Sequence, residues 1–337
     1  MNPGNQGFWA KLKKPMFVLA PMADVTDPAF RRMFAKYGKP DVTWTEFVSA
    51  DGLIRATEVG KKKLMRDLLY TEAERPIIAQ LFSSHPEYMK QAAALVRELG
   101  FDGIDINMGC PDRSIEKQGA GAAMIRNPAL AREVIRAAQE GAQTHTGGIP
   151  VSVKTRIGYN KNELETWLPE ILKENPAAVT IHARTRKEMS LVPARWEHVK
   201  RAVEIRDELQ KDLPEKTLIL GNGDVKDLND ARQKCEETGA DGAMLGRAIF
   251  GNPWRFNKDI DIAHVSIHDR LTAMVEHTKL FMELLGDIKS FAVMKKHYKA
   301  YVNNFDGAAE LRAKLMETNN EHEVEQIVGD FLTNISK

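Results

Sequence analysis

Residues 100–112 read Gly-Phe-Asp-Gly-Ile-Asp-Ile-Asn-Met-Gly-Cys-Pro-Asp, a short apolar run that follows a glycine and ends in polar residues. Residues 239–246 repeat the opening of this stretch as Gly-Ala-Asp-Gly-Ala-Met-Leu-Gly. A glycine at the start of such a stretch is typical of a helix that ends and turns into the next strand. The two stretches therefore predict a repeated unit in which a helix is followed by a strand.

Short apolar runs alternate with amphipathic helical stretches through the first three quarters of the chain. This alternation is typical of βα units and a parallel sheet. The strand-like runs are residues 16–20, 43–47, 77–82, 103–107, 151–155, 178–182, 218–221 and 242–246. Eight such runs match a closed barrel better than an open doubly wound sheet, so the expected fold class is α/β with a (β/α)₈ TIM barrel.

The pattern changes after Trp254, because helical periodicity continues almost to the end and no further strand signal appears. Apolar residues recur at spacings of three and four from Leu271 to Leu285, and Gly286 is expected to stop this helix. We expect two domains, a catalytic barrel over residues 1–258 and an all-helical domain over residues 259–337. No linker rich in Pro, Gly or Ser separates them, so the helical domain should pack directly on the barrel.

Length and composition exclude several classes of protein. A chain of 337 residues with 43% hydrophobic and 28% charged residues is neither a small disulfide-stapled fold nor a disordered chain. The 48 basic and 47 acidic residues give a net charge of +1, so a polyanionic partner would have to be held by a local basic patch. The two cysteines, Cys110 and Cys235, form neither a metal-type pair nor a disulfide framework, and no signal peptide or membrane-spanning run is apparent. A cytoplasmic monomer without a metal or a membrane partner is expected.

Barrel enzymes carry their active sites at the carboxyl ends of the strands. Glycine-rich loops follow the seventh and eighth predicted strands, as Gly221-Asn222-Gly223-Asp224 and Gly246-Arg247. Their backbone N–H groups and the Arg247 guanidinium suit a phosphate group. The alternative is that the glycines only make tight turns, but the two loops together favour phosphate.

Three polar residues lie within or at the end of other apolar runs. Lys154 needs an anion if it points into the barrel mouth, or it extends past the strand end to water. His182 is either functional or a neutral packing residue. Gln80 carries a donor and an acceptor that suit the edge of a flavin or uracil ring, or it is a buried glutamine satisfied by the backbone.

Cys110 lies between Gly109 and Pro111, which fix its backbone in a loop at the expected active end of the barrel. A thiol with an ordinary pKa of about 8.5 is largely protonated at neutral pH, so it can donate a proton as well as act as a nucleophile. The alternative is a small buried hydrophobic residue. Cys235 lies in a helical pattern and is assigned no chemistry.

Motifs along nearly the whole chain resemble, in order, those of the tRNA-dihydrouridine synthase family. They are Ala20-Pro21-Met22-Ala23, Val25-Thr26-Asp27, Gln80-Leu81, Asp105-Ile106-Asn107-Met108-Gly109-Cys110-Pro111, Gly119-Ala120-Gly121-Ala122, Val153-Lys154-Thr155-Arg156, Thr180-Ile181-His182-Ala183-Arg184-Thr185, Gly221-Asn222-Gly223-Asp224, Gly246-Arg247, Met294-Lys295-Lys296-His297 and Phe305-Asp306-Gly307-Ala308-Ala309-Glu310-Leu311-Arg312. One departure is the segment 187–196, near where substrate should approach, which lacks the aromatic-x-Gly-x-Ala pattern common in the family.

The resemblance implies an enzyme that binds FMN in the barrel, takes electrons from NADPH and reduces the C5=C6 bond of particular uridines in tRNA. It implies that Cys110 is the general acid. The residues expected to contact the flavin are Pro21, Met22, Ala23, Gln80, Lys154 and His182, with Asn222, Gly223, Asp224, Gly246 and Arg247 around its phosphate. Asn107, Arg184 and Arg186 are expected on the substrate side.

Uracil chemistry agrees with this implication. Hydride from the reduced flavin is expected to add at C6, and a proton must then reach C5; a positioned thiol can supply it, which is worth roughly 10²–10⁴-fold. Lys154 would stabilise the anionic edge of the reduced flavin. The target base must also leave the tRNA stack to reach the bottom of a barrel mouth.

Charge within the helical part is uneven, because residues 288–316 hold six basic and two acidic residues. Lys295, Lys296 and Lys299 are expected to face tRNA, although an ordinary solvated helix face is the alternative; in that case Arg184, Arg186 and Lys187 at the barrel rim would carry the contacts. Two other functions stay open at this point. One is an FMN barrel that reduces a small enone, and the other is a non-catalytic RNA-binding protein with a retained flavin.

Overall fold

A closed parallel barrel forms the centre of the computed structural model, which describes residues 6–145, 147–260 and 262–335. Its eight-stranded sheet has the order β1-β10-β9-β8-β7-β4-β3-β2. The strands are β1 (Met16–Leu19), β2 (Thr43–Ser49), β3 (Ile77–Phe82), β4 (Gly103–Met108), β7 (Val151–Arg156), β8 (Ala178–His182), β9 (Leu218–Asn222) and β10 (Gly242–Leu245). An isolated parallel bridge joins Val18 of β1 to Val42, the residue before β2, and closes the barrel. The TIM barrel and all eight predicted strands are confirmed.

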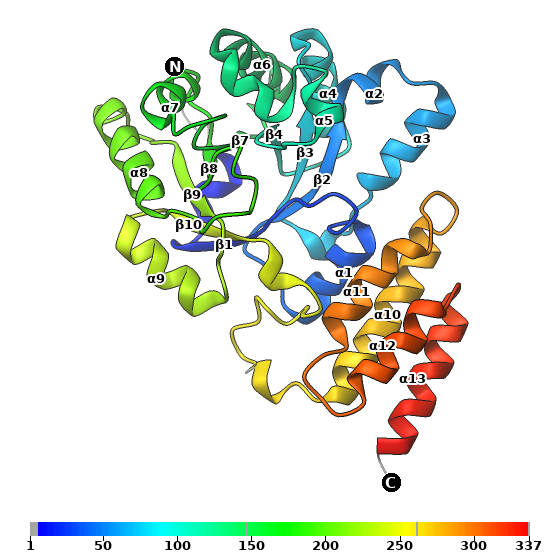
Figure 1. Ribbon diagram of the computed structural model, residues 1–337. Coiled ribbons are helices and arrows are strands. Elements are labelled where there is room, and N and C mark those ends of the chain that lie inside the picture. The colour runs from blue at the N-terminus through cyan, green and yellow to red at the C-terminus, as the bar shows by residue number, and fades with distance from the viewer. Residues whose placement is uncertain (1–5, 146, 261, 336–337) are drawn as a thin grey trace.

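Helices surround this barrel and continue beyond it on one side (Figure 1). Around the strands lie α1 (Pro28–Tyr37), α2 (Ala50–Arg55), α3 (Glu58–Asp67), α4 (Pro86–Glu98), α5 (Arg113–Glu116), α6 (Pro128–Ala142), α7 (Leu164–Leu172), α8 (Glu197–Leu209) and α9 (Leu228–Thr238). The helices beyond the barrel are α10 (Ile267–Leu285), α11 (Ala292–Tyr301), α12 (Ala308–Glu317) and α13 (Glu321–Ile335). A two-stranded hairpin of β5 (Gln143–Thr144) and β6 (Gly147–Gly148) was not expected from the sequence.

Local sequence explains where these helices begin and end. Asp27 accepts a hydrogen bond from the backbone N–H of Phe30 at 2.9 Å, and Pro28 fills the first turn, so α1 begins there. Gly100 and Gly239 follow α4 and α9 with φ of 82° and 73°. This left-handed conformation favours glycine, and it confirms that both residues turn a helix into the next strand.

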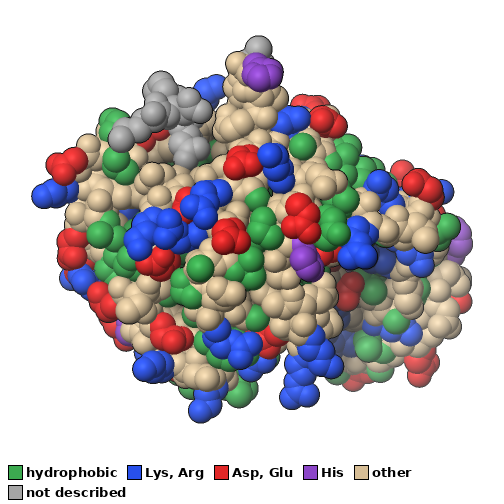
Figure 2. Space-filling view, turned by 90° about the horizontal axis from the view of Figure 1, so that it is seen from above, with side chains coloured by type: hydrophobic (Ala, Val, Ile, Leu, Met, Phe, Trp, Pro, Cys, Tyr) green, Lys and Arg blue, Asp and Glu red, His purple; other side chains and the backbone are tan. Residues whose placement is uncertain are grey.

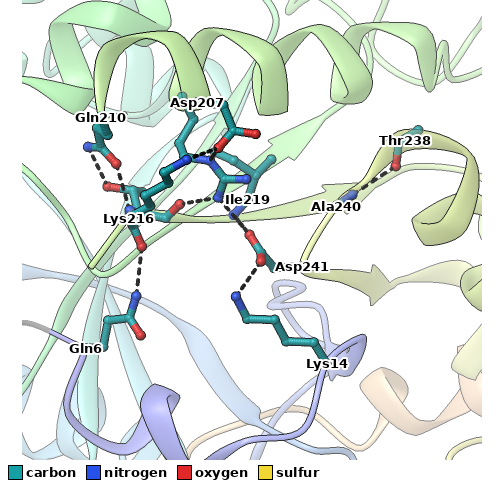
Figure 3. A network of polar contacts seen from close by, with 11 residues as sticks. Gln6, Lys14, Asp207, Gln210, Lys216, Ile219, Thr238, Ala240 and Asp241 are labelled. Atoms are coloured by element: carbon teal, nitrogen blue, oxygen red, sulfur yellow. Dashed lines mark hydrogen bonds and ion pairs between the residues drawn. The ribbon is translucent and has the colours of Figure 1, made fainter. Parts of the chain in front are cut away.

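Three aspartates that precede strands close the amino end of the barrel in the same way. Asp41, Asp102 and Asp241 each accept the backbone N–H of the preceding strand, from Phe17 at 2.7 Å and from Ile77 and Ile219 at 2.8 Å. In Figure 3, Ile219 and Lys14 converge on Asp241, and the Lys14 ammonium lies 2.6 Å from its carboxylate. A buried guanidinium, that of Arg206, also contacts Asp241 at 3.0 Å. The aspartates thus satisfy N–H groups that would otherwise lack partners.

The helices α10 to α13 share their core with the barrel. Ala29 and Met33 of α1, together with Trp254, belong to the same buried cluster as Phe281, Tyr298 and the other apolar residues of these helices. Glu276 on α10 accepts hydrogen bonds from Lys36 and Tyr37, both at 2.6 Å. The helical part therefore packs directly on the barrel. The domain limits 1–258 and 259–337 stay a prediction, and their outer ends, 1–5 and 336–337, lie outside the described residues.

Replacing Asp241 by alanine should lower the free energy of unfolding by about 3 kcal/mol, because the change removes a carboxylate partner of the buried Arg206 guanidinium and leaves the buried Ile219 N–H without its acceptor. Urea denaturation followed by circular dichroism would measure this. The control is Glu72→Ala, which removes an 82% exposed partner of Arg75 and should cost less than about 1 kcal/mol. Equal losses for the two variants would contradict a structural role for the buried aspartate.

Candidate functional site

A cavity of about 300 Å³ opens at the carboxyl ends of the strands. Every strand of the barrel, or the loop that follows it, contributes to its wall. The lining residues are Ala20, Pro21, Met22, Phe47, Gln80, Asn107, Gly109, Cys110, Pro111, Lys154, Arg156, His182, Arg184, Ser190, Asn222, Gly223, Asp224, Val225, Gly246 and Arg247. Four of these side chains are Lys or Arg and one is an acid, so the cavity suits an anion.

Most of the residues expected at the site meet in this cavity. The exceptions near the barrel are Ala23, which is exposed and does not line the wall, and Arg186, which pairs with Glu116 outside it. Sequence reasoning did not assign Phe47, Arg156 or Ser190 to the site. Arg156 stands two positions after Lys154, and the period of two in a strand puts both on one face; this signal could have identified it.

Lys154 is a cation on the wall of the cavity. Burial, reinforced by the charge of Arg156, lowers the pKa of its ammonium to about 8. Asp105 opposes this shift, but its carboxylate is occupied by the Ser152 hydroxyl and the Gln80 amide, each at 2.6 Å. Lys154 forms no ion pair within 4.0 Å in the described ranges. A partly buried cation without a carboxylate next to it favours an anionic ligand.

The side-chain amides of Gln80 and Asn107 connect Asp105 to the Cys110 loop. The Asn107 amide donates to Gln80 Oε1 at 3.2 Å, and Asn107 Oδ1 accepts the backbone N–H groups of Gly109 at 3.1 Å and Cys110 at 2.9 Å. Arg156 Nε donates to the Gly109 carbonyl at 2.8 Å. Asn107, expected to bind substrate, therefore also holds the backbone of the Cys110 loop.

The Cys110 side chain faces the cavity from this braced loop. Burial raises the pKa of its thiol above the ordinary value, although the charges of Lys154 and Arg156 act in the opposite direction. The neutral thiol is therefore the form present at pH 7. Such a group is suited to donate a proton rather than to attack as a thiolate.

His182 lines the cavity from β8, next to Arg184. Burial, followed by the charges of Arg156 and Lys154, lowers the pKa of His182 well below its ordinary value. Its imidazole is therefore neutral at pH 7. The Arg184 guanidinium lies 3.2 Å from His182 Nε2; because a guanidinium only donates, Nε2 accepts and Nδ1 carries the proton.

Asp224 organises the arginines at the other end of the cavity. Its carboxylate pairs with both Arg184 and Arg247, and it accepts the backbone N–H of Ala194 at 2.8 Å. Burial alone would raise the pKa of Asp224, but the bond from Arg184 and these further contacts lower it overall. The Asp224 carboxylate thus orients the guanidinium groups of Arg184 and Arg247. The Arg247 side chain remains 66% exposed at the mouth of the cavity. Neighbouring Gly223, with φ of 119°, keeps the backbone accessible where a Cβ would lie 2.8 Å from Ala194.

The segment 187–196 covers one side of the mouth. Arg156 and Arg184 donate to the backbone carbonyls of Met189 and Val192, at 3.0 and 2.6 Å. The Trp196 indole donates to the Gly223 carbonyl at 2.8 Å, and its ring fills the space next to Gly221, where a Cβ would lie 2.2 Å from the ring. These contacts fix the loop, while its tip at Leu191 is 86% exposed.

The lysines expected on the helical face have different surroundings. Lys295, Lys296 and Lys299 lie on α11 and form no ion pair in the described part of the chain; Lys296 and Lys299 are exposed. Lys289, counted with them in the basic stretch, is instead buried against Glu46 and Asp67, at 2.9 and 3.0 Å. On the face drawn in Figure 2, basic and acidic side chains are interspersed rather than gathered by sign.

The described residues hold neither a candidate metal site nor a candidate membrane-spanning helix. No group of three or more His, Cys, Asp or Glu side chains within 6–145, 147–260 and 262–335 could hold a metal ion. None of the helices in these ranges has both the length and the apolar character needed to cross a membrane.

Sequence comparison relates the chain to one family over nearly its full length. The family model described as "Dihydrouridine synthase (Dus)" matches residues 18–336. "Probable tRNA-dihydrouridine synthase 2" of Bacillus subtilis (strain 168) is 38% identical over 338 residues, which cover 97% of each chain. "Probable tRNA-dihydrouridine synthase" of Staphylococcus aureus (strain COL) is 37% identical over 328 residues, 97% of this chain and 96% of that protein.

Solved structures resemble the barrel at much lower identity. Histamine dehydrogenase from Rhizobium sp. 4-9 has a TM-score of 0.52 at 12% identity, over 79% of this chain and 49% of that one. Morphinone reductase has a TM-score of 0.50 at 14% identity, over 75% of this chain and 88% of that one. At such identities the likeness concerns the fold alone.

The raised pKa of Cys110 predicts slow alkylation. Iodoacetamide should modify Cys110 at pH 7 at least about tenfold more slowly than free cysteine, and the rate should rise roughly tenfold per pH unit to pH 9, because only the thiolate reacts. Intact-mass spectrometry would measure the rate. Cys110→Ser is the control, since burial raises the pKa of the remaining Cys235 to about 12. A rate that levels off below pH 8 would show an activated thiolate.

Proposed function

Because the chain belongs to the dihydrouridine synthase family, we propose that it reduces particular uridines of tRNA to 5,6-dihydrouridine, with FMN bound in the barrel and NADPH as the electron donor. The single observation that carries the proposal is Lys154, a partly buried cation on the cavity wall without a carboxylate next to it. We also expect the protein to act as a monomer in the cytoplasm, where tRNA is found.

The residues of the cavity fit a flavin mononucleotide. Its volume of about 300 Å³ and its mixed lining are those of a small-molecule pocket. Lys154 would balance negative charge on the pyrimidine edge of the ring, next to Gln80. The backbone at Gly223 and Gly246 and the Arg247 guanidinium would hold the phosphate, and Asp224 would keep Arg247 in place.

FMN, when bound, would supply the hydride chemistry that the protein's side chains lack. Reduction of the uridine C5=C6 bond also requires one proton at C5. We assign this proton to the Cys110 thiol, which the raised pKa keeps protonated at neutral pH. The charge of Arg156 favours the thiolate left after transfer, and the thiol regains its proton from water.

The tRNA would lie across the cavity mouth and α11. The exposed Lys296 and Lys299, with Lys295, would contact backbone phosphates, which position the RNA without reading its sequence. Arg184 and Arg186 would contact it at the barrel rim. The target uridine would enter the cavity as a flipped base.

The direct test uses purified protein, NADPH and an unmodified tRNA transcript. We expect bound FMN, dihydrouridine in the tRNA by mass spectrometry, and no reaction with free uridine. Cys110→Ala should still be reduced by NADPH but should reduce tRNA about 10²–10⁴-fold more slowly, since only proton delivery is lost. Reduction of a small enone but not of tRNA would favour a small-molecule reductase, and flavin binding without any turnover would favour an RNA-binding protein.

Reversing two charges on α11 tests the tRNA contacts. Lys295→Glu combined with Lys299→Glu should weaken tRNA binding and lower the slope of log affinity against log salt by roughly one unit per lost contact. Binding measured at several salt concentrations, beside NADPH oxidation with oxygen, would show this. The control reverses Lys200 on α8 and Lys211, two residues beyond its end; α8 lies on the other side of the barrel from α11 (Figure 1). Equal slopes for both double variants would move the tRNA contacts to the barrel rim.

A further inference from the structure

One lysine of the helical part is inserted among the carboxylates of the barrel. Lys289 follows α10, and its ammonium lies 2.9 Å from Glu46, 3.0 Å from Asp67 and 3.8 Å from Asp24. The side chains of Lys289 and Glu46 are only 15% and 6% exposed. A largely buried ion pair of this kind adds little net stability, because the cost of removing both charges from water offsets their attraction.

A bulge in β2 brings this ion pair next to the cavity. Trp44 is paired with Ile78 and Phe47 with Gln80, so β2 holds one residue more than β3 over this stretch. The Thr45 hydroxyl fills the gap by accepting the Gln80 N–H at 3.1 Å. Such a bulge breaks the alternation of side chains along a strand. As a result Phe47 lines the cavity while the adjacent Glu46 carboxylate meets Lys289.

The same carboxylate also holds the loop after β1. One oxygen of Glu46 faces Lys289, and the other accepts the backbone N–H of Asp24. Asp24 has φ of 52°, a left-handed conformation that is unfavourable for a residue other than glycine. The bond to Glu46 compensates for it. Within the same turn, Met22 N–H donates to the Thr26 hydroxyl at 2.9 Å, and Met22 lines the cavity.

From these contacts we propose that Lys289 is a positioning residue for the cofactor pocket. Through Glu46 it fixes the turn at Met22 and the direction of Phe47, so the seating of the helical part on the barrel controls the shape of the pocket. The inference rests on the proposed function, because it takes the cavity to be the FMN site. It adds that the helical part, which is expected to bind tRNA, is connected to the cofactor pocket through the contact between Lys289 and Glu46.

A second cation, Arg66, also joins the barrel to the helical part. It can therefore serve as a control that tells a positioning role of Lys289 apart from a contact that only holds the two parts together. Arg66 on α3 donates to the Leu284 carbonyl at 2.7 Å and pairs with Asp287 at 2.8 Å. It therefore joins the barrel to the same turn between α10 and α11. Arg66 does not line the cavity. Its contacts as described reach neither Glu46 nor the turn at Met22.

The experiment compares Lys289→Met, Lys289→Arg and Arg66→Met as purified full-length proteins. FMN affinity is measured by titration into flavin-stripped protein, with the visible circular dichroism of bound FMN as a second readout. Lys289→Met should weaken FMN binding by at least about tenfold and change the dichroism. Lys289→Arg should restore both, and Arg66→Met should stay within about twofold of wild type. Lys289→Met with the affinity and spectrum of Arg66→Met would overturn the proposal.

Glu46→Gln tests the same contact by changing the partner of Lys289 on the barrel. It keeps the proposal testable if Lys289→Met does not fold. Lys289 keeps Asp67 as a partner in this variant, so the protein should fold. Its FMN affinity should fall by about threefold or more; an unchanged affinity would overturn the proposal. Wild-type protein that binds no FMN would overturn the proposed function itself, whereas wild-type binding with silent variants would overturn only the role of Lys289.

Discussion

A closed parallel barrel separates its chemistry by strand direction, because unpaired strand N–H groups collect at one end and the side chains that follow the strands collect at the other. The protein places opposite charges at the two ends. At the amino end, Asp41, Asp102 and Asp241 accept strand N–H groups. At the carboxyl end, Lys154, Arg156, Arg184 and Arg247 surround the cavity. The acids at the amino end complete the barrel, whereas Lys154 at the carboxyl end has no carboxylate partner within 4.0 Å in the described residues.

The cationic end carries a cost that the amino end does not. Burial lowers the pKa of Lys154 to about 8 and that of Arg156 to about 10, which means that the protein holds both in an environment unfavourable to charge. An anionic ligand relieves this penalty and, by binding only the folded chain, raises its stability. Burial also keeps His182 neutral and Cys110 protonated; the nearby cations reinforce the shift of the pKa of His182 and oppose that of Cys110.

The repeating part of the structure was predictable from the sequence, and the exceptions to the repeat were not. Eight strands and most cavity residues follow from hydrophobic periodicity and from the polar residues after each run. Phe47 was missed because the search for site residues considered polar side chains, and the bulge that turns this apolar residue to the cavity has no signal in the sequence. Lys289 was misjudged because counting charges does not reveal that Glu46 and Asp67 neutralise it. The β5–β6 hairpin has two residues per strand, too few for a pattern.

The way the segment 187–196 is anchored affects how the protein can change over generations. Arg156 and Arg184 bind its backbone carbonyls, at Met189 and Val192, and these acceptors are present whatever side chains occupy the positions. The two arginines that anchor the segment belong to the barrel, whereas the Leu191 side chain at the tip is exposed to solvent. Mutations can therefore accumulate at the tip without loss of loop shape, and the region next to the cavity can diversify while the barrel stays constant.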